Sequence, residues 1–462
     1  MALLPTIGLE IHAELRTSTK MFCNCKNDPD EERPNVNICP ICLAHPGTLP
    51  VINREAVRQV LRAGAALGGT LAHFSEFDRK SYFYPDIPKG YQISQYEHPL
   101  VTGGTLAGVA ITRIHLEEDT ARSTHGENKS LIDFNRAGIP LMELVTEPVI
   151  HDAKTAGDFA RELQLLLRTL GASEANLEKG EMRIEANVSV ASGEERLGTK
   201  TEVKNLNSFR SVERAIAYEI ERQTKAFERG EKLAQETRGW DETKQETFHQ
   251  RFKEGSADYR YFPEPDLPKL VLEDVPEFAC EALTASLPEL PSQKRERYAR
   301  LGIKSDDRAY LAADVARSAF FDAVTKELDG RPKSTVLAAN YFISDMAGDP
   351  CVASPSSFAA LIQMFAANEL SSRGAKDVLA IMITKGGEPA VIAKERGLGQ
   401  IQDRGTLEAA VERVMEEEPG AVKEYRAGKS GTLQYLLGKA MKVTGGAGDP
   451  ELLREILIKK LG

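Results

Sequence analysis

Residues 6–15, TIGLEIHAEL, alternate without a break between apolar side chains and polar or small ones. A period of two is the pattern of a β-strand, in which successive side chains point to opposite faces. Residues 183–190, RIEANVSV, show the same pattern. We therefore predict two strands, each with an apolar face that a core must cover and a mostly polar face. The apolar positions are Ile7, Leu9, Ile11, Ala13, Leu15, Ile184, Ala186, Val188 and Val190.

Acidic side chains recur on these predicted strands and on two others. Glu10 shares a face with His12, and Glu185 lies on the polar face of the second stretch. Glu118 in TRIHLEED and Glu143 in PLMELVTEP each lie an even number of positions from neighbouring apolar residues, so each would point to the same face of its strand as those residues. A carboxylate on an apolar face is costly unless it is paired or bound to a metal. Such strands together with a histidine favour a cation site of the Mg²⁺ type, in which oxygen ligands dominate; the alternative is an ordinary solvated strand face.

Four of the six cysteines lie within residues 23–42, as a Cys-x-Cys pair and a Cys-x2-Cys pair separated by 13 residues. Two thiol pairs joined by a short loop are a usual arrangement for tetrahedral zinc. A site closed by four thiolates has no open coordination position, so we expect this zinc to be structural rather than catalytic. The alternative is four unrelated cysteines. The residues are Cys23, Cys25, Cys39 and Cys42.

Length and composition exclude several classes of protein. The 462 residues suggest about three domains. No apolar run approaches the roughly 20 residues of a membrane span, and the amino-terminal residues lack the basic segment of a signal peptide. We therefore expect a cytoplasmic protein with reduced thiols and no membrane partner.

Charge is distributed unevenly along the chain. The net charge is −10, but residues 371–462 carry 15 Lys+Arg and 13 Asp+Glu, which leaves −12 for residues 1–370. A strongly acidic body does not bind nucleic acid non-specifically. An RNA partner would therefore have to be recognised by shape and local contacts.

Aromatic and basic residues are interleaved in two segments, DRKSYFYPDIPKGYQISQY and DYRYFPEPDLP. Such a composition can bind nucleic acid or phosphate groups. Tyrosines that only anchor loops, beside solvated charges, are the alternative. No glycine-rich phosphate loop is present, because RAGKSG at residues 426–431 lacks the leading glycine of that motif.

Several long motifs, in order along the chain, resemble the B subunit of aspartyl/glutamyl-tRNA amidotransferases. The motifs are GLEIHAEL, KMFCNC, CPICLAHPGTLPVIN, DRKSYFYPDIPKGYQISQY, HLEED, DFNRAGIPLMELVTEP, KTEVKNLNSFRSVERAIAYEIERQ, QETRGWDE and DYRYFPEPDLP. They run from residue 7 to about residue 268, and the carboxy-terminal region resembles the YqeY-like part of the same family. The resemblance therefore covers nearly the whole chain.

The resemblance implies an α+β fold: a catalytic cradle domain built on antiparallel sheet, an all-α helical domain and a small helical tail. We place the boundaries at residues 1–290, 291–400 and 401–462, with the cysteine cluster inside the cradle and tRNA binding in the tail. The local pattern agrees, since strand-like alternation prevails to about residue 290 and helical periodicity follows. Within the cradle we expect helices over residues 154–170 and 211–229.

The resemblance also implies a reaction. Members of the family amidate Glu-tRNA(Gln), and often Asp-tRNA(Asn), after ATP phosphorylates the side-chain carboxylate, and ammonia then displaces phosphate. ATP as a substrate, Mg²⁺ and a structural Zn²⁺ are thus expected. No ammonia-producing motif is found in this chain, so the family implies a separate amidase A subunit and a small C subunit in a heterotrimer, with the mischarged tRNA as substrate.

Site residues follow from the family position by position. Magnesium ligands are expected at Glu10, His12, Glu118, Glu143 and Glu185, with Glu117 beside them. Arg79, Lys80 and Tyr82 match a motif that the family places near the active site and the ammonia path. Arg183 and Lys204 are candidates for binding phosphate.

The chain departs from the family pattern at two places that bear on the site. Glu185 stands where Asp is usual, so the extra methylene can replace direct coordination by contact through water. Thr120-Ala121-Arg122 stand where Ala-Gly-Lys is usual, which puts the role of that loop's cation in doubt. Two other classes remain open: a non-catalytic zinc protein that binds tRNA, and a stand-alone metal-dependent hydrolase using Glu10 and His12. The choice between Glu-tRNA and Asp-tRNA is not encoded in these patterns.

Overall fold

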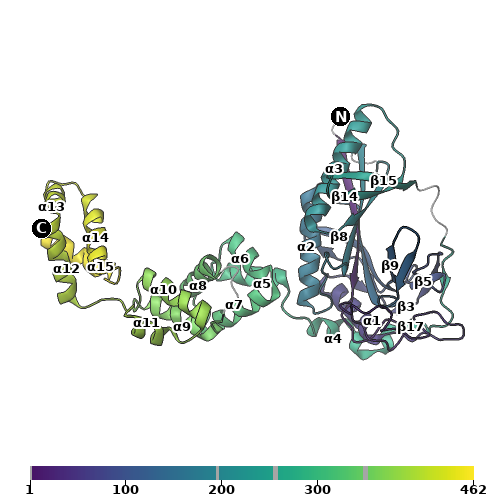
Figure 1. Ribbon diagram of the computed structural model, residues 1–462, viewed down its shortest axis with the longest axis horizontal. Coiled ribbons are helices and arrows are strands. Elements are labelled where there is room, and N and C mark those ends of the chain that lie inside the picture. The colour runs from purple at the N-terminus through teal and green to yellow at the C-terminus, as the bar shows by residue number, and fades with distance from the viewer. Residues whose placement is uncertain (1–2, 194–196, 253–258, 347–351) are drawn as a thin grey trace. The chain divides into compact units, whose positions relative to one another are not determined.

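The alternating stretch at the amino terminus forms the central strand of the structure. The computed structural model describes residues 3–193, 197–252, 259–346 and 352–462 (Figure 1), and the chain divides into two units, residues 1–290 and 291–462. Strand β1 (Leu3–Glu14) lies between β11 (Pro140–Thr146) and β12 (Met182–Ser192), antiparallel to both. Its apolar side chains are buried in the main core, as the alternation predicted.

The main sheet of unit 1 has ten strands in the order β15-β14-β13-β12-β1-β11-β8-β6-β2, with β7 paired to β8. Neighbours are antiparallel except β13 and β14. The further strands are β2 (Thr70–Leu71), β6 (Val101–Thr102), β7 (Thr105–Leu106), β8 (Val109–Glu118), β13 (Thr201–Leu206), β14 (Glu236–Asp241) and β15 (Glu246–Phe252).

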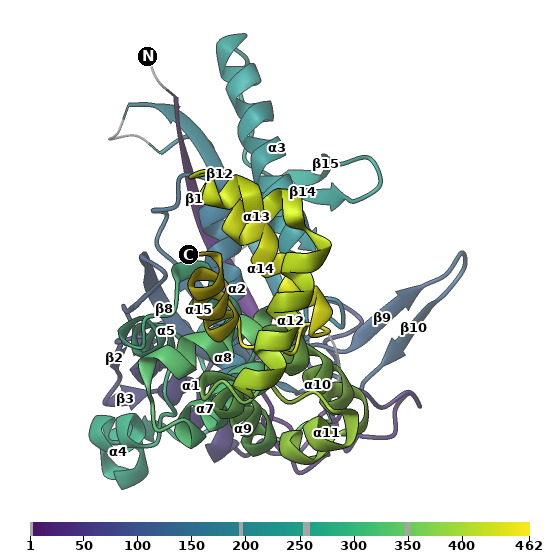
Figure 2. The ribbon, with the colours of Figure 1, turned by 90° about the vertical axis from the view of Figure 1, so that its left-hand side faces the viewer.

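Three small sheets accompany the main one. A three-stranded sheet, in the order β16-β4-β5, joins segments that are far apart in the sequence, and β9 and β10 form a hairpin that extends away from the main sheet (Figure 2). The strands are β3 (Phe74–Ser75), β4 (Asp78–Ser81), β5 (Tyr91–Ser94), β9 (Arg122–His125), β10 (Ser130–Asp133), β16 (Phe262–Pro263) and β17 (Leu270–Val271), the last paired with β3.

Two long helices cover one face of the main sheet (Figure 1). A side chain just before each helix accepts a hydrogen bond from a backbone N–H of the first turn, which is the usual way to satisfy that turn. The Asp152 side chain accepts from the N–H of Thr155, and the Ser208 side chain accepts from the N–H of Ser211. The two helices are α2 (Ala153–Thr169) and α3 (Phe209–Glu228), close to the expected ranges 154–170 and 211–229. Unit 1 also contains α1 (Arg54–Ala66), α4 (Cys280–Ala285) and the 3₁₀ turns Leu272–Asp274 and Pro276–Phe278.

In the described residues of unit 2 every named secondary-structure element is a helix, and these helices form two separate hydrophobic cores. Phe321 and Phe358 belong to the first core, formed by α5 to α11, whereas Val411 and Leu453 belong to the second, formed by α12 to α15. The α+β fold class with a helical carboxy-terminal region is thus confirmed. The helices are α5 (Pro291–Arg300), α6 (Ser305–Ala312), α7 (Val315–Glu327), α8 (Pro332–Asp345), α9 (Pro355–Ala366), α10 (Ser372–Lys385), α11 (Pro389–Arg396), α12 (Arg404–Glu417), α13 (Pro419–Arg426), α14 (Thr432–Val443) and α15 (Pro450–Leu461).

None of the helices in the described part of the chain combines the length and the apolar character that crossing a bilayer requires.

Helix α1 approaches the sheet so closely at Gly64 that a side chain there has no room. A Cβ at this position would lie 2.8 Å from Cγ1 of Val101 and closer still to its Cγ2. We expect Gly64→Ala to lower the free energy of unfolding of unit 1 by about 1–3 kcal/mol, because overpacking forces neighbours apart. Calorimetric melting of the full chain measures this change.

The matched test is the double variant Gly64→Ala/Val101→Ala. Removing the two methyl groups of Val101 makes room for the new Cβ, so the double variant should be more stable than the sum of the two single changes indicates. Additive losses would show that the close approach does not limit packing at this point.

Candidate active site

The register of the central strands places five ionisable side chains on one face of the main sheet. His12 on β1 lies opposite Glu143 on β11, and Glu143 lies opposite His115 on β8; directly opposed residues in antiparallel strands share a face. The imidazole Nε2 atoms of His12 and His115 each lie 3.3 Å from Oε2 of Glu143. Glu10 and Glu117 complete the group, 3.9 and 3.7 Å from Nε2 of His12. We call these five residues the acid cluster.

The electrostatics of the acid cluster favour positive charge at its centre. Burial alone would lower the pKa of His12, but the carboxylates of Glu143, Glu117 and Glu10 together raise it to about 9. Burial, with Glu143 nearby, raises the pKa of Glu10 to about 7. Burial would also raise the pKa of Glu143, yet His115 and His12 hold it well below its usual range. The carboxylates thus attract protons onto their neighbours where no other cation neutralises them.

The acid cluster contains two sets of three potential metal ligands. Glu10, His12 and Glu143 form one set, and His115, Glu117 and Glu143 form the other, with the ligand atoms of each set within 4.8 Å of one another. The Nδ1 atom of His115 is buried without a hydrogen-bond partner. Carboxylate oxygens with one or two imidazoles are a suitable donor set for a divalent cation. The residues present therefore fit a metal ion.

Two predicted magnesium ligands lie at or beyond the edge of the acid cluster. Glu185 is directly opposite Glu10 and its Oε1 accepts a hydrogen bond of 2.7 Å from Nζ of Lys204. Glu118 belongs to neither ligand set. It alternates with Glu117 along β8, and its Oε1 accepts from Lys89 and from the backbone N–H of a β5 residue.

The sequence pattern of β8 does not show which of its two adjacent carboxylates, Glu117 or Glu118, would bind a metal. Glu118 lies on the same face of β8 as its apolar residues, and such a carboxylate was expected to be either paired or bound to a metal. Here Lys89 provides the positive charge, and Glu118 lines a cavity of about 280 Å³ together with Lys89 and Cys42. His115 was not among the residues predicted from the sequence. It lies two positions before Glu117, which was expected beside the ligands, and this even spacing along β8 is the signal that would have found it.

The two expected phosphate-binding cations lie on the same side of the acid cluster in the sheet, Arg183 on β12 next to β1 and Lys204 on β13 beyond it. Arg183 lies opposite His12 and donates from Nη2 to Oδ2 of Asp119 at 2.8 Å. Arg136 approaches the same Asp119 oxygen at 3.7 Å. Lys204, one strand further out, is paired with Glu185 as described above. Both cations therefore already have a carboxylate partner.

The DRKSYFYPD motif forms β4 and its extension, and its side chains alternate in direction. Arg79 makes two 2.7 Å hydrogen bonds to buried Glu264 and lies 4.3 Å from the ring centroid of Tyr91, so it braces the small sheet. Burial alone would lower the pKa of Lys80, but Glu117 and Glu143 raise it. Burial and Glu117 raise the pKa of Tyr82. Lys80 and Tyr82 thus lie near the acid cluster, whereas Arg79 has a structural partner.

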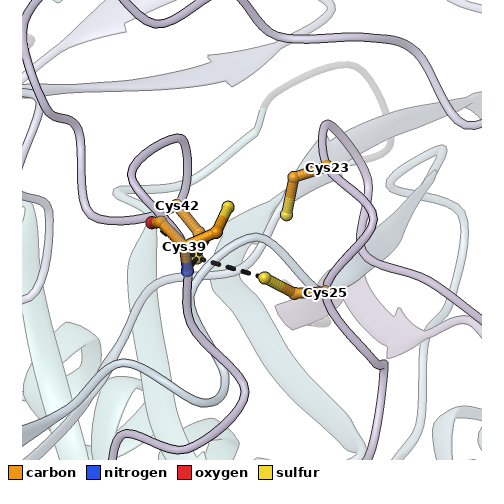
Figure 3. A group of neighbouring side chains, drawn as sticks. All are labelled: Cys23, Cys25, Cys39 and Cys42. Atoms are coloured by element: carbon orange, nitrogen blue, oxygen red, sulfur yellow. Dashed lines mark hydrogen bonds between the residues drawn. The ribbon is translucent and has the colours of Figure 1, made fainter.

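The four cysteines of residues 23–42 point toward one another (Figure 3). Their Sγ atoms lie within 4.8 Å, with Cys25 and Cys42 4.0 Å apart and Cys42 and Cys39 3.9 Å apart. A hydrogen bond from Cys23 lowers the pKa of Cys42 to about 5, and the backbone N–H of Cys39 donates to the same sulfur at 3.1 Å. All four thiols are free. The arrangement is consistent with a metal site closed by four sulfurs.

The cysteine loop is tied to the segment that leads into β11. The side-chain oxygen of Asn135 accepts the N–H groups of Val36 and Asn37, each at 2.9 Å, and its amide donates to the carbonyl of Arg33 at 2.7 Å. The N–H of Asn35 donates to Asp133 at 2.9 Å. The loop therefore supports the strand on which Glu143 stands.

Comparison with known proteins identifies the family. Residues 5–276 match the model of the GatB/GatE catalytic domain, and residues 320–461 match that of the GatB domain. Proteins described as B subunits of aspartyl/glutamyl-tRNA(Asn/Gln) amidotransferase are similar over nearly their whole length. The protein of Thermus thermophilus is 44% identical over 99% of this chain and 98% of its own length. That of Crocosphaera subtropica is 42% identical over 98% of this chain and 97% of its own length. That of Anaeromyxobacter dehalogenans is 41% identical over 99% of this chain and 98% of its own length. The chain belongs to the family of aspartyl/glutamyl-tRNA amidotransferase B subunits.

Proposed function

We propose that this protein is the ATP-dependent subunit that activates and amidates the amino acid of Glu-tRNA(Gln), Asp-tRNA(Asn) or both. The observation that carries the proposal is the acid cluster on the central strands of the part of the chain that matches a catalytic domain; three of its residues are buried, and Glu10 and His12 are half-buried. Rival classes fit less well. A binding module has no need of several buried carboxylates on one face, and a stand-alone hydrolase offers no role for the flanking cations.

The chemistry requires positive charge near the reacting carboxylate. A carboxylate is a poor acyl donor, so phosphorylation first converts one oxygen into a leaving group, which ammonia then displaces. Mg²⁺ held by Glu10, His12 and Glu143 would neutralise charge on the transferring phosphoryl group. Glu117 and Glu185 lie at the edge of this set, where they would hold its water molecules or complete its coordination.

The cations around the acid cluster have two roles in this proposal. Lys80 lies close enough to Glu117 and Glu143 for their charges to raise its pKa, so it would hold a phosphate group against the cluster as a compact point charge. Arg183 is held in place by Asp119, and Lys204 by Glu185. Each can bind a phosphate oxygen with the donors that its partner leaves free.

Partners follow from the family and from what the chain lacks. We infer that ammonia comes from an amidase A subunit, that a small C subunit completes a heterotrimer, and that the tRNA body contacts the α12–α15 module. The four-cysteine site would hold a structural zinc ion, since its geometry is closed. Zinc there would stabilise the loop that supports β11 and take no part in the reaction.

Changing His12 to alanine should reduce ATP-dependent phosphorylation of the aminoacyl carboxylate by at least about 100-fold, because the cation loses a ligand and Glu10 and Glu143 lose their partner. Glutamine hydrolysis on the A subunit should persist at least in part. Single-turnover transfer from labelled ATP in the assembled complex measures the first step. A variant that still produces amidated tRNA at a near wild-type rate would show that the metal assignment is wrong.

A matched pair of variants decides between the adjacent carboxylates. Glu117→Gln should weaken binding of Mn²⁺, used as a spectroscopic substitute for Mg²⁺, whereas Glu118→Gln should leave it within about twofold. The reverse result would establish Glu118, the residue expected from the family, as the ligand.

Purified protein should contain one zinc ion per chain, and Cys39→Ser should lose it to a chelator at least about tenfold faster, because one thiolate is removed from the closed site. Elemental analysis and a colorimetric zinc assay measure these quantities. Protein without metal in which all four thiols react freely would rule out the site.

Deleting residues 401–462 should raise the KM for tRNA and flatten its dependence on salt, since each phosphate contact that is lost removes affinity and salt sensitivity. The cut falls between the two cores of unit 2, so the first core stays intact. The KM values for ATP and glutamine serve as controls and should not change. Filter binding across a salt series decides the matter: unchanged tRNA affinity would mean that the tail is only structural.

A further inference from the structure

Five tyrosine rings form a continuous row beside the acid cluster. In order they are Tyr84, Tyr82, Tyr259, Tyr261 and Tyr96, with neighbouring ring centroids 5.9, 6.0, 6.0 and 4.3 Å apart. The first three contacts are edge-to-face, and the last is a parallel stack with an interplanar angle of 13°. The row has no counterpart in the mechanism proposed above.

The row is assembled from segments that are far apart in the sequence. The N–H of Ser81, at the end of β4, donates to the carbonyl of Tyr259 at 2.9 Å, and Phe262 on β16 lies opposite Arg79 on β4. The N–H of Tyr96, just beyond β5, donates to Asp78 at 2.9 Å. The small three-stranded sheet therefore fixes the ring positions through its backbone.

The middle of the row adjoins the acid cluster. Burial raises the pKa of Tyr261 to about 12, an effect that Lys80 opposes and Glu117 and Glu143 reinforce. Ser94, two residues before Tyr96, donates to Oε2 of Glu117 at 3.0 Å. The ammonium of Lys80 lies 5.1 Å from the ring centroid of Tyr259. Charged groups and aromatic faces thus meet at one place.

The Tyr96 end of the row is open. Tyr261 covers one face of the Tyr96 ring, yet Tyr96 is 55% exposed, so its other face is turned to solvent. Among the described residues no further aromatic ring pairs with Tyr96. A parallel pair of rings with one free face is a surface on which a flat heterocycle continues the stack.

We propose that the free face of Tyr96 is the stacking site of an adenine ring during the reaction. The inference rests on the proposed function, which brings two adenines to the acid cluster: that of ATP and that of the 3′-terminal nucleotide, to which the amino acid is attached. The phosphoryl group of ATP and the aminoacyl carboxylate must meet at the acid cluster. Each of the two adenines is therefore brought near the cluster. Stacking suits a single-stranded RNA end as well as a nucleotide, because each offers an unpaired base.

The test compares ligands with and without the base, using the assembled complex. Tyr96→Leu removes the ring but keeps an apolar side chain. If the base of tRNA is bound, this variant should weaken binding of uncharged tRNA ending in CCA at least about fivefold and leave tRNA that lacks the terminal adenosine unchanged. If the base of ATP is bound, ATP binding should weaken to the same extent and tripolyphosphate binding should not.

Two further variants control for structure. Tyr96→Phe keeps the ring and should restore the affinity that Tyr96→Leu loses. Phe248→Leu removes an exposed ring from β15, an edge strand of the main sheet, and should behave as the wild type. Melting temperature and gel filtration report whether each variant folds and assembles.

Two outcomes overturn the inference: unchanged affinity for both base-bearing ligands, or equal losses of affinity with and without the base in a complex that assembles normally. These are distinguishable from failure of the proposed function. If wild-type complex does not amidate either mischarged tRNA, the function is wrong whatever Tyr96 binds; if it does and Tyr96→Leu binds every probe normally, only the stacking site is wrong.

Discussion

The antiparallel pairing of β1 with β11 and β12 is the constraint on which the rest of the structure depends. A slip of one residue would turn His12 and Glu10 toward the core and Ile11 toward solvent, because side chains alternate with a period of two. The register is fixed by more than the backbone ladder: the N–H of Leu9 donates to Oγ1 of Thr146 at 2.9 Å in the buried interior. The apolar face and the reactive face are therefore specified by the same set of hydrogen bonds.

This arrangement places a destabilising group of charges on a strongly stabilised element. Several carboxylates crowded on one buried face repel one another and lose solvation, which costs free energy unless cations or protons compensate. The opposite face of β1 contributes fully buried aliphatic side chains to the main core, each worth about 1.5–3 kcal/mol on burial. The acid cluster thus lies on a strand whose buried apolar face offsets the free-energy cost of the crowded carboxylates.

The sequence predicted β1, β12 and the two long helices α2 and α3, but not the partners of the charged side chains. Alternation is a local property, so β1, β12 and the polar identity of their faces were accessible. The distinction between Glu117 and Glu118 depends on Lys89, some thirty positions earlier, whose ammonium satisfies one of the two. The bracing role of Arg79 depends on Glu264, which lies 185 residues away. Pairings at such separations are set by tertiary structure, and no local pattern reports them.

The hydrogen bonds between the cysteine loop and residues 133–135 favour one order of folding over the other. Thirteen residues separate the two thiol pairs, whereas the bond from Asn35 to Asp133 closes a loop of 98 residues, and closing the longer loop costs more chain entropy. The thiols also leave the ribosome well before the segment that they will meet. The loop can thus be complete while β8 and β11 are still being synthesised, and it then offers its backbone as a template for the later segment. The later segment would in this way depend for its placement on a loop that it does not itself build.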